Sequence, residues 1–241
     1  MKTLNTYINE WKANKSTTTS IREENMNYFI CSQQNNTKNH IKIFNPIWPL
    51  FNYYKDKVYI NDEHDEVDNY GYTKNLYEPG RYKITIDEIN IANSCRSMFQ
   101  DSQLIEEVCF LNMPNLIDIE GMFLNCVNLK KVSLLHTKKL EKMQMAFFGC
   151  TQLTEVSKID THNVKYMNQS FANCENLETV PQFDTKNVEN MYRMFANCTN
   201  LKHVPLFDLS SVRMITIVKM FDNCKNISDK TKNAWKQYIY F

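Results

Sequence analysis

A unit of 24 residues recurs from residue 95 onward, and this repeat constrains the fold more than any other feature of the chain. Phenylalanine, cysteine and valine each return at that interval, in three columns that keep one register. The columns are Phe99, Phe123, Phe147, Phe171 and Phe195; Cys126, Cys150, Cys174 and Cys198; and Val108, Val132, Val156, Val180 and Val204, with Phe221 and Cys224 following after 26 residues. A fixed period of roughly 20 to 50 residues is typical of a solenoid, whose units bury their apolar faces against their neighbours.

The composition indicates a folded protein with almost no net charge. The 241 residues are 43% hydrophobic, which allows a sizeable core, and the net charge is +1. So small a charge gives no long-range attraction for nucleic acid or an anionic membrane, so neither is expected as a partner. No apolar run reaches the roughly 18 residues of a membrane-spanning helix. The N-terminus lacks a secretory signal, which favours a cytoplasmic or virion-associated location over a secreted one.

Eight cysteines raise the question of a disulfide framework, and five of them lie in the repeat column. An odd number of thiols cannot pair off within one column, so the sequence favours a ladder of small buried thiols. Adjacent coils about 4.8 Å apart would also be close enough for a disulfide, and that alternative stays open. Because no Cys-x-x-Cys or Cys-x-x-His pair occurs, we expect no zinc site.

The residues before the repeat fall into two segments. Residues 1–40 indicate a short helix and then a polar linker; the helix would present Leu4, Tyr7, Ile8 and Trp11 on one side. Residues 41–91 indicate a small antiparallel β unit, with strands at 41–44, 57–60 and 82–86. Because a small sheet exposes its edges, we expect it to cap the first coil of the solenoid.

One acidic cluster in the β unit invites a metal hypothesis. It begins within the two-residue hairpin turn expected at Asn61 and Asp62 and consists of Asp62, Glu63, His64, Asp65, Glu66 and Asp68. The spacing does not fit an EF-hand loop, and side chains along a return strand alternate between two faces. We therefore expect a solvated hairpin and no metal ion here.

Within one repeat, the residues at 185–208 predict a helix and then a strand. Apolar residues follow helical spacing over about three turns, at Val188, Met191, Met194, Phe195 and Cys198. Asp184 and Thr185 stand where an N-cap belongs, and residues 201–207 form the strand. Asparagines recur beside the cysteines at Asn125, Asn173, Asn197 and Asn223, and we expect them to bond the backbone at each turn.

These elements predict an α/β solenoid resembling a leucine-rich-repeat protein, over residues 92–227. In-register strands repeat about every 4.8 Å, whereas packed helices need about 8 to 10 Å, so the stack should curve with its strands on the concave side. Residues 228–241 form a C-terminal cap over the open end, with a helix that includes Ala234, Trp235, Tyr238 and Phe241.

The repeat also resembles a known family. The matching motif is Phe-Asp-Thr-x-x-Val-x-x-Met-x-x-Met-Phe-x-x-Cys-x-x-Leu at residues 183–201. It is similar to the repeat of BspA-like leucine-rich-repeat surface proteins of bacteria, in the short Met-Phe-x-x-Cys branch found also in mycoplasma-type lipoproteins. The resemblance covers about residues 95–227. It implies adhesion or protein–protein interaction and supplies no catalytic residues.

Nothing in the residues themselves indicates catalysis. The five histidines, His40, His64, His136, His162 and His203, occupy different repeat positions. No phosphate-binding loop, Gly-x-Ser-x-Gly elbow or zinc-protease helix occurs, and glycine is scarce. We therefore expect no enzyme, no catalytic residues and no cofactor.

Outward strand residues are the expected partner-binding positions, because the core does not dictate them. They are Phe110, Leu134, Lys158, Gln182 and Leu206 in one column, together with His203 from another. Exposed Phe110, Leu134 and Leu206 would form an apolar interaction patch on the concave face. The alternatives are that the N-terminal β unit or a neighbouring subunit covers these residues, or that the inward and outward assignment is shifted by one residue. The leading hypothesis is a non-enzymatic module that binds a protein or a surface glycan. The alternative is a structural subunit of a larger assembly, such as a virion or a surface layer, with the β unit around Trp48 docking on neighbours.

Overall fold

The computed structural model describes residues 27–33, 39–86, 89–110, 112–134, 136–157 and 159–239. The helix expected near the N-terminus and the candidate residue Lys158 lie outside these residues. None of the helices in the described residues is long and apolar enough to cross a membrane.

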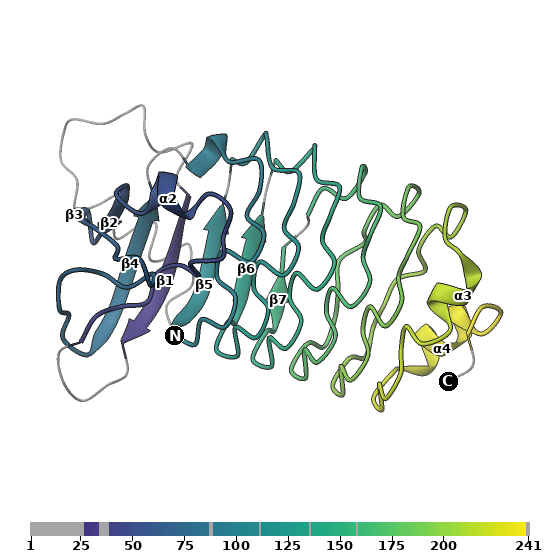
Figure 1. Cartoon of the computed structure of the whole chain (residues 1–241). Helices are drawn as coiled ribbons and strands as arrows, with labels where there is room; N and C mark the ends of the chain where they lie inside the picture. The colour runs from purple at the N-terminus through teal and green to yellow at the C-terminus, as the bar shows by residue number, and fades with distance from the viewer. Residues whose placement is uncertain are drawn as a thin grey trace, which may run out of the picture.

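One mixed sheet of seven strands covers the N-terminal half of the described chain, up to Val156, in the order β3-β2-β4-β1-β5-β6-β7 (Figure 1). The strands are β1 (Asn27–Gln33), β2 (Val58–Ile60), β3 (Glu63–Asp65), β4 (Gly80–Ile86), β5 (Ile105–Phe110), β6 (Lys131–Leu134) and β7 (Glu155–Val156). Pairing is antiparallel from β3 through to β5 and parallel between β5, β6 and β7. The helices are short: α2 (Phe51–Tyr54), the 3-10 helix η2 (Ile89–Ile91), α3 (Met214–Ile217) and α4 (Asp229–Trp235).

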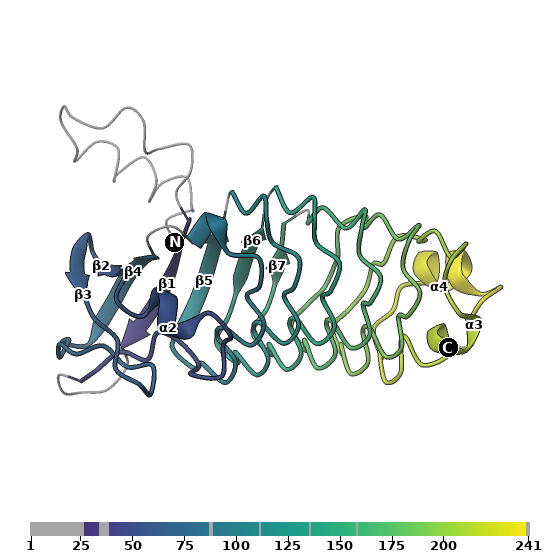
Figure 2. The same ribbon diagram turned by 45° about the horizontal axis from the view of Figure 1, so that its top comes forward.

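After η2 the chain winds into coils that stack side by side (Figures 1 and 2). On one side β5, β6 and β7 pair in register, so that residues 24 apart face each other, as Val108 faces Val132. On the opposite side a second ladder of parallel bridges joins residues of the same spacing. It runs through Ser94, Asp118, Lys142, Tyr166 and Asn190. Both sides of the stack are therefore held by backbone hydrogen bonds between neighbouring coils.

The α-helix predicted in each repeat is wrong. Between Val188 and Cys198 the chain forms a bridge at Asn190 and then tight turns. Arg193 and Asn197 have positive φ values of 52° and 61°, which a right-handed helix cannot contain. The same two positions are left-handed in earlier coils, for example at Gln169 and Asn173.

The backbone hydrogen bonds explain this conformation, because successive N–H groups alternate between two kinds of acceptor. The N–H groups of Phe195 and Asn197 donate to carbonyl oxygens in the next coil, whereas those of Met194 and Ala196 donate three residues back. Half of the donors thus behave as in a strand and half as in a turn. The N-cap prediction at Thr185 is also wrong, because its hydroxyl donates to the carbonyl oxygen of Asp208 in the following coil.

Because the predicted helices do not form, the physical argument for a curved stack does not apply. Curvature was expected because strands and helices pack at different spacings. Here both ladders are backbone ladders with the same spacing, and the coils form a nearly straight row (Figure 2).

The core consists of side-chain ladders that follow the repeat. The rings of Phe99, Phe123, Phe147, Phe171, Phe195 and Phe221 stack in sequence, with centroids 5.0 to 5.8 Å apart. Met191, Met194 and Cys198 are fully buried, so the core membership expected of the apolar stripe is confirmed although its helix is not. Parallel stacking at this distance gives contact on both faces of each internal ring.

Beside the rings lies the predicted ladder of buried thiols. All eight cysteines are free. Each column thiol donates to the carbonyl oxygen of the phenylalanine in the preceding coil, for example from Cys150 to Phe123 at 3.1 Å and from Cys174 to Phe147 at 3.1 Å. Burial raises the pKa of these two thiols well above the ordinary value, so both stay protonated at neutral pH.

Asparagines beside the cysteines link neighbouring coils through their side chains, and not through the backbone bonds that the sequence led us to expect. The Asn197 side chain donates to Asn173 at 2.7 Å and Asn223 donates to Asn197 at 2.9 Å. All three have positive φ, which asparagine tolerates better than most residues. These amides therefore stabilise both the turn and the stack.

An antiparallel unit covers the first coil. Strands form near 57–60 and 82–86, and Asn61 and Asp62 make the expected hairpin turn with φ values of 50° and 71°. The segment at 41–44 is no strand, although Lys42 forms a bridge with Tyr72. The main surprise is β1, which comes from the expected polar linker and joins β4 to β5 in one continuous sheet.

A helix closes the other end, in the segment where the sequence predicts one. The side chain of Ser228 caps α4 by accepting from the backbone N–H of Thr231. Trp235 packs edge-on against Phe207 and Phe221, at the end of the ring stack. The final coil is thereby covered by an aromatic lid.

Candidate binding surface

The outward side chains on the strand side of the coils form a surface that we call the strand face. Its central column consists of outward residues that backbone pairing places side by side: Glu107 beside Lys131, Lys131 beside Glu155, and Thr179 beside His203. While the buried columns repeat phenylalanine, cysteine and valine, this outward column changes its chemistry from coil to coil. The fold thus holds varied side chains at a regular spacing.

Two of the predicted contact residues are not on this surface. Phe110 and Leu134 are fully buried, so the prediction of an exposed apolar column is wrong for both. They alternate with Cys109 and Ser133 along regular strands β5 and β6, and they therefore point to the same side as Val108 and Val132.

The column changes sides later in the stack, and the prolines continue a change that begins one coil earlier, where Ile159 is buried. Pro181 and Pro205 directly follow the buried valines of their coils and cannot donate to a strand ladder. The regular strand already shortens to two residues in β7, before the first of these prolines, and it is reduced to a single bridge at Thr179 and His203 in the coils that contain them. The next core residue is then the third after valine, as in Phe183 and Phe207, which leaves the second position exposed.

The remaining described candidates lie together on the C-terminal half of the strand face. Gln182 and Leu206 are exposed in adjacent coils, Leu206 with 42% of its surface accessible. The Gln182 amide donates weakly to the carbonyl oxygen of Leu206, at 3.4 Å. His203 is exposed as well, and its Nδ1 lies 3.0 Å from the Ser228 hydroxyl of the lid. Lys158 falls outside the described residues.

The charges of the N-terminal half of the strand face are paired with one another. Arg81 contacts Glu106 at 3.2 Å and Glu107 at 3.0 Å, and Lys130 also approaches Glu106, at 3.6 Å. Lys131 contacts Glu155 at 2.6 Å across adjacent strands. This half is therefore close to neutral, and its side chains already have partners within the chain.

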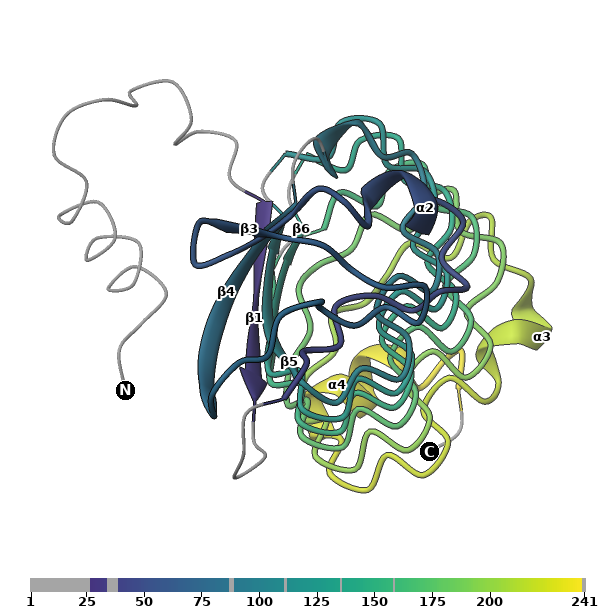
Figure 3. The ribbon, with the colours of Figure 1, turned by 60° about the vertical axis from the view of Figure 1, so that its left-hand side comes forward.

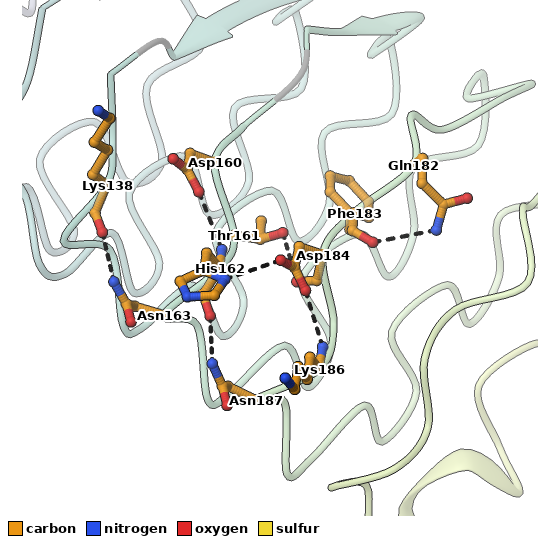
Figure 4. Close-up of polar contacts among 10 residues, drawn as sticks. All are labelled: Lys138, Asp160, Thr161, His162, Asn163, Gln182, Phe183, Asp184, Lys186 and Asn187. Carbon is orange, nitrogen blue, oxygen red and sulfur yellow. Dashed lines mark hydrogen bonds and ion pairs between the residues drawn. The ribbon is translucent and has the colours of Figure 1, made fainter.

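The strand face continues into a row of tight turns that we call the loop edge, formed by residues 160–163, 184–187 and 208–211. Figure 4 shows two of these turns beside Gln182. The carboxylates of Asp160 and Asp184 each accept from the backbone N–H two residues later. Asn187 donates to the carbonyl oxygen of His162 at 2.7 Å, which joins one turn to the next.

An exposed histidine–carboxylate pair lies at the centre of the loop edge. Nδ1 of His162 lies 3.0 Å from Asp184 (Figure 4). The hydrogen bond with His162 lowers the pKa of Asp184, with help from the backbone N–H of Lys186. At the next turn, the backbone N–H and the hydroxyl of Ser210 lower the pKa of Asp208. Both carboxylates are therefore ionised at neutral pH and available to a partner.

Sequence reasoning missed the loop edge because it assigned these residues to helix caps. The available signal was the return of Asp160, Asp184 and Asp208 at 24-residue intervals outside the apolar columns. Aspartate favours a turn that bonds its own backbone as readily as an N-cap, so spacing alone did not distinguish the two.

Other candidate groups are dispersed over the structure. Trp48, expected to dock on neighbours, is buried and donates from its indole nitrogen to the carbonyl oxygen of Ser94. Asp65 in the acidic hairpin is buried and accepts from the Tyr77 hydroxyl at 2.8 Å. Among the described residues, no three His, Cys, Asp or Glu side chains come close enough to hold a metal ion.

Comparison with known proteins gives one match, to part of the chain. Residues 117–235 match the family model described as DUF285, a Mycoplasma protein of unknown function. The matched region extends from the second coil to the end of α4. No curated protein and no solved structure shows significant similarity to the chain. The match is compatible with a repeat protein and leaves the activity open.

Proposed function

We propose that the chain is a non-enzymatic binding module that engages a protein or a surface glycan through its strand face and the adjoining loop edge. The observation that carries this proposal is the contrast between two kinds of column. Inward columns repeat the same residue, whereas the outward column of Glu107, Lys131, Glu155, Thr179 and His203 changes at every coil. A regular backbone whose exposed side chains differ from coil to coil is suited to recognising a partner.

The contact site that we infer lies on the C-terminal half of the surface. There Thr179, Gln182 and Leu206 are exposed and uncharged, next to the Asp184 and His162 pair. Polar groups around one apolar side chain can contribute both hydrogen bonds and buried area to a partner. The N-terminal half contributes less, because its charges pair within the chain.

In this proposal the stack is a leucine-rich-repeat-like solenoid in which turns replace the helices. The resemblance to BspA-like surface proteins and the match to DUF285 both concern the same repeat. An adhesive role follows from the resemblance and is part of the proposal.

Substitutions on the strand face should weaken partner binding without unfolding the chain. The strand-face variant carries Thr179→Glu, Gln182→Ala and Leu206→Ser, all at exposed positions. Ligands selected on the wild type from a printed glycan panel and a displayed peptide library should bind this variant about tenfold or more weakly, since loss of one or two contact residues costs about 1–3 kcal/mol. Dissociation constants from biolayer interferometry measure the difference.

A matched variant on the opposite side controls for general effects. It carries Lys142→Ala, Tyr166→Ser and Tyr192→Ser, where the two tyrosines are each 37% exposed. The selected ligands should bind it as they bind the wild type. Equal losses in both variants, or no loss in the strand-face variant, would contradict the assignment of the site.

A further inference from the structure

The last coil carries an apolar projection that the other coils lack. The repeat is two residues longer there, and its residues Met214–Ile217 form α3, on the side opposite the strands (Figure 3). Met214, Ile215 and Val218 are 52%, 77% and 58% exposed, although Ile217 between them is fully buried. Contiguous apolar side chains that are this exposed are typical of an interaction site.

Positive charge surrounds this projection. Residues 209–239 contain six basic and two acidic residues, a net charge of +4. Arg213 and Lys219 flank α3 and are exposed, as are Lys225 and Lys230. Within the described residues, the structure shows an ion pair only for Asp222 in this segment, with Arg193 at 3.6 Å. The C-terminal end of the stack therefore attracts an acidic partner.

The opposite end of the same molecule has the complementary charge. The β2–β3 hairpin and its flanks, residues 55–68, contain six acidic and two basic residues, a net charge of −4, although Asp65 is buried and Glu66 is paired with Lys74 just outside the segment. Asp56, Asp62 and Glu63 are exposed there, and β3 is the outermost strand of the sheet. In Figure 1, β3 lies at one end of the row of coils and α3 and α4 lie at the other.

Exposed apolar groups accompany the acidic end too. Tyr70, in the turn after β3, is 74% exposed, and Tyr53 is 50% exposed. The ring of Tyr53 lies 3.9 Å from the ammonium group of Lys57, which places it beside the hairpin. The hairpin end thus offers aromatic surface within an acidic rim, and the α3 end offers aliphatic side chains within a basic rim.

We propose that the α3 end of one molecule docks on the β2–β3 hairpin end of a second copy, so that the chains associate head to tail. Complementary charges would align the ends, and Ile215 and Val218 would bury apolar area against the hairpin end. Because the two surfaces differ, this contact is heterologous, and repeated addition produces a ring or a filament. This contact would give the role of a structural subunit a specific partner, a second copy of the chain, and two defined surfaces. It does not involve the strand face.

The test uses two variants of the full chain, each blocked at one end. The lid-end variant carries Ile215→Asp and Val218→Asp, and the hairpin-end variant carries Asp56→Asn, Asp62→Asn and Glu63→Gln. Sedimentation velocity should show concentration-dependent association of the wild type at low salt, weakened about tenfold or more at high salt as the ends are screened. Each variant alone should stay monomeric, because it retains only one functional end.

An equimolar mixture of the two variants is the decisive sample. It should form a 1:1 dimer and nothing larger, since one lid end and one hairpin end remain intact between them. A wild type that stays monomeric at low salt up to its solubility limit would overturn the proposal. So would association that either variant retains alone, or a mixture without dimers. Thermal unfolding of each variant, with a midpoint close to the wild type, checks that the substitutions leave the fold intact.

Discussion

Replacing Phe147 with alanine should lower the free energy of unfolding by about 3–5 kcal/mol, the usual cost of emptying a buried phenylalanine site. Its ring is fully buried and stacks between Phe123 at 5.4 Å and Phe171 at 5.0 Å. The cavity would interrupt the ring stack at its centre, and the backbone ladders on both sides would prevent the coils from closing over it. Urea unfolding followed by fluorescence measures the change.

The next residue supplies the control. Phe148 has the same side chain in the same coil but is only half-buried and makes no ring contact in the described core. Phe148→Ala should cost about 1 kcal/mol or less. Equal effects at the two positions would contradict the register of the ring stack.

Gly71→Ala should also destabilise the chain by about 3 kcal/mol or more, which is among the larger effects of a single substitution. Gly71 has a φ of +91°, where an alanine is strained, and an added Cβ would overlap the carbonyl oxygen of Phe44. That oxygen belongs to the backbone and cannot rotate away. The carbonyl oxygen of Gly71 in turn accepts from the N–H groups of Ile43 and Phe44, so any shift breaks these bonds.

Gly80→Ala is the matched substitution in the same unit. A Cβ at Gly80 would meet only the Tyr82 side chain, at 3.8 Å, an ordinary contact. Stability within about 0.5 kcal/mol of the wild type is expected, as for most surface positions. Thermal and urea unfolding of both variants test the pair, and a tolerated Gly71→Ala would show that the turn at 68–71 packs differently against Phe44.

The repeat predicted the core correctly because burial depends only on which residues recur. Phe195, Cys198 and Val204 are buried as their columns require. The thiol ladder followed from the same columns. The lid around Trp235 was predictable for a related reason, since an open last coil needs a cover.

The helix was mispredicted because a spacing of three residues has two explanations. Turns closed by hydrogen bonds between residues three apart place Met191 and Met194 on one side, as a helix would. The distinguishing signal is the residue at the left-handed positions. Asparagine and glycine tolerate the left-handed conformation, so Asn173, Asn197 and Gly149 indicate it. Gln169 and Arg193 are also left-handed, but their residue types do not indicate it.

The site was predicted in part, for reasons of local geometry. Strict alternation would have placed Phe110 and Leu134 inward with Val108, whereas from the coil of Ile159 onward the buried residue is the third after valine. A single rule of inward and outward alternation therefore cannot assign the strand residues in both halves of the stack. Strand β1 was missed because a short segment within a polar stretch gains its stability from pairing with β4 and β5, which no local pattern reveals.

The central structural claim is that hydrogen bonds between coils, and not helices within them, hold the repeat together. The most direct measurement is the scalar coupling across a hydrogen bond, observed by NMR, between the amide nitrogen of Phe171 and the carbonyl carbon of Met194. The amide nitrogen of Phe171 lies 2.9 Å from the carbonyl oxygen of Met194 in the neighbouring coil, so the coupling should be present. Its absence, together with continuous helical chemical shifts from Val188 to Cys198, would contradict the account.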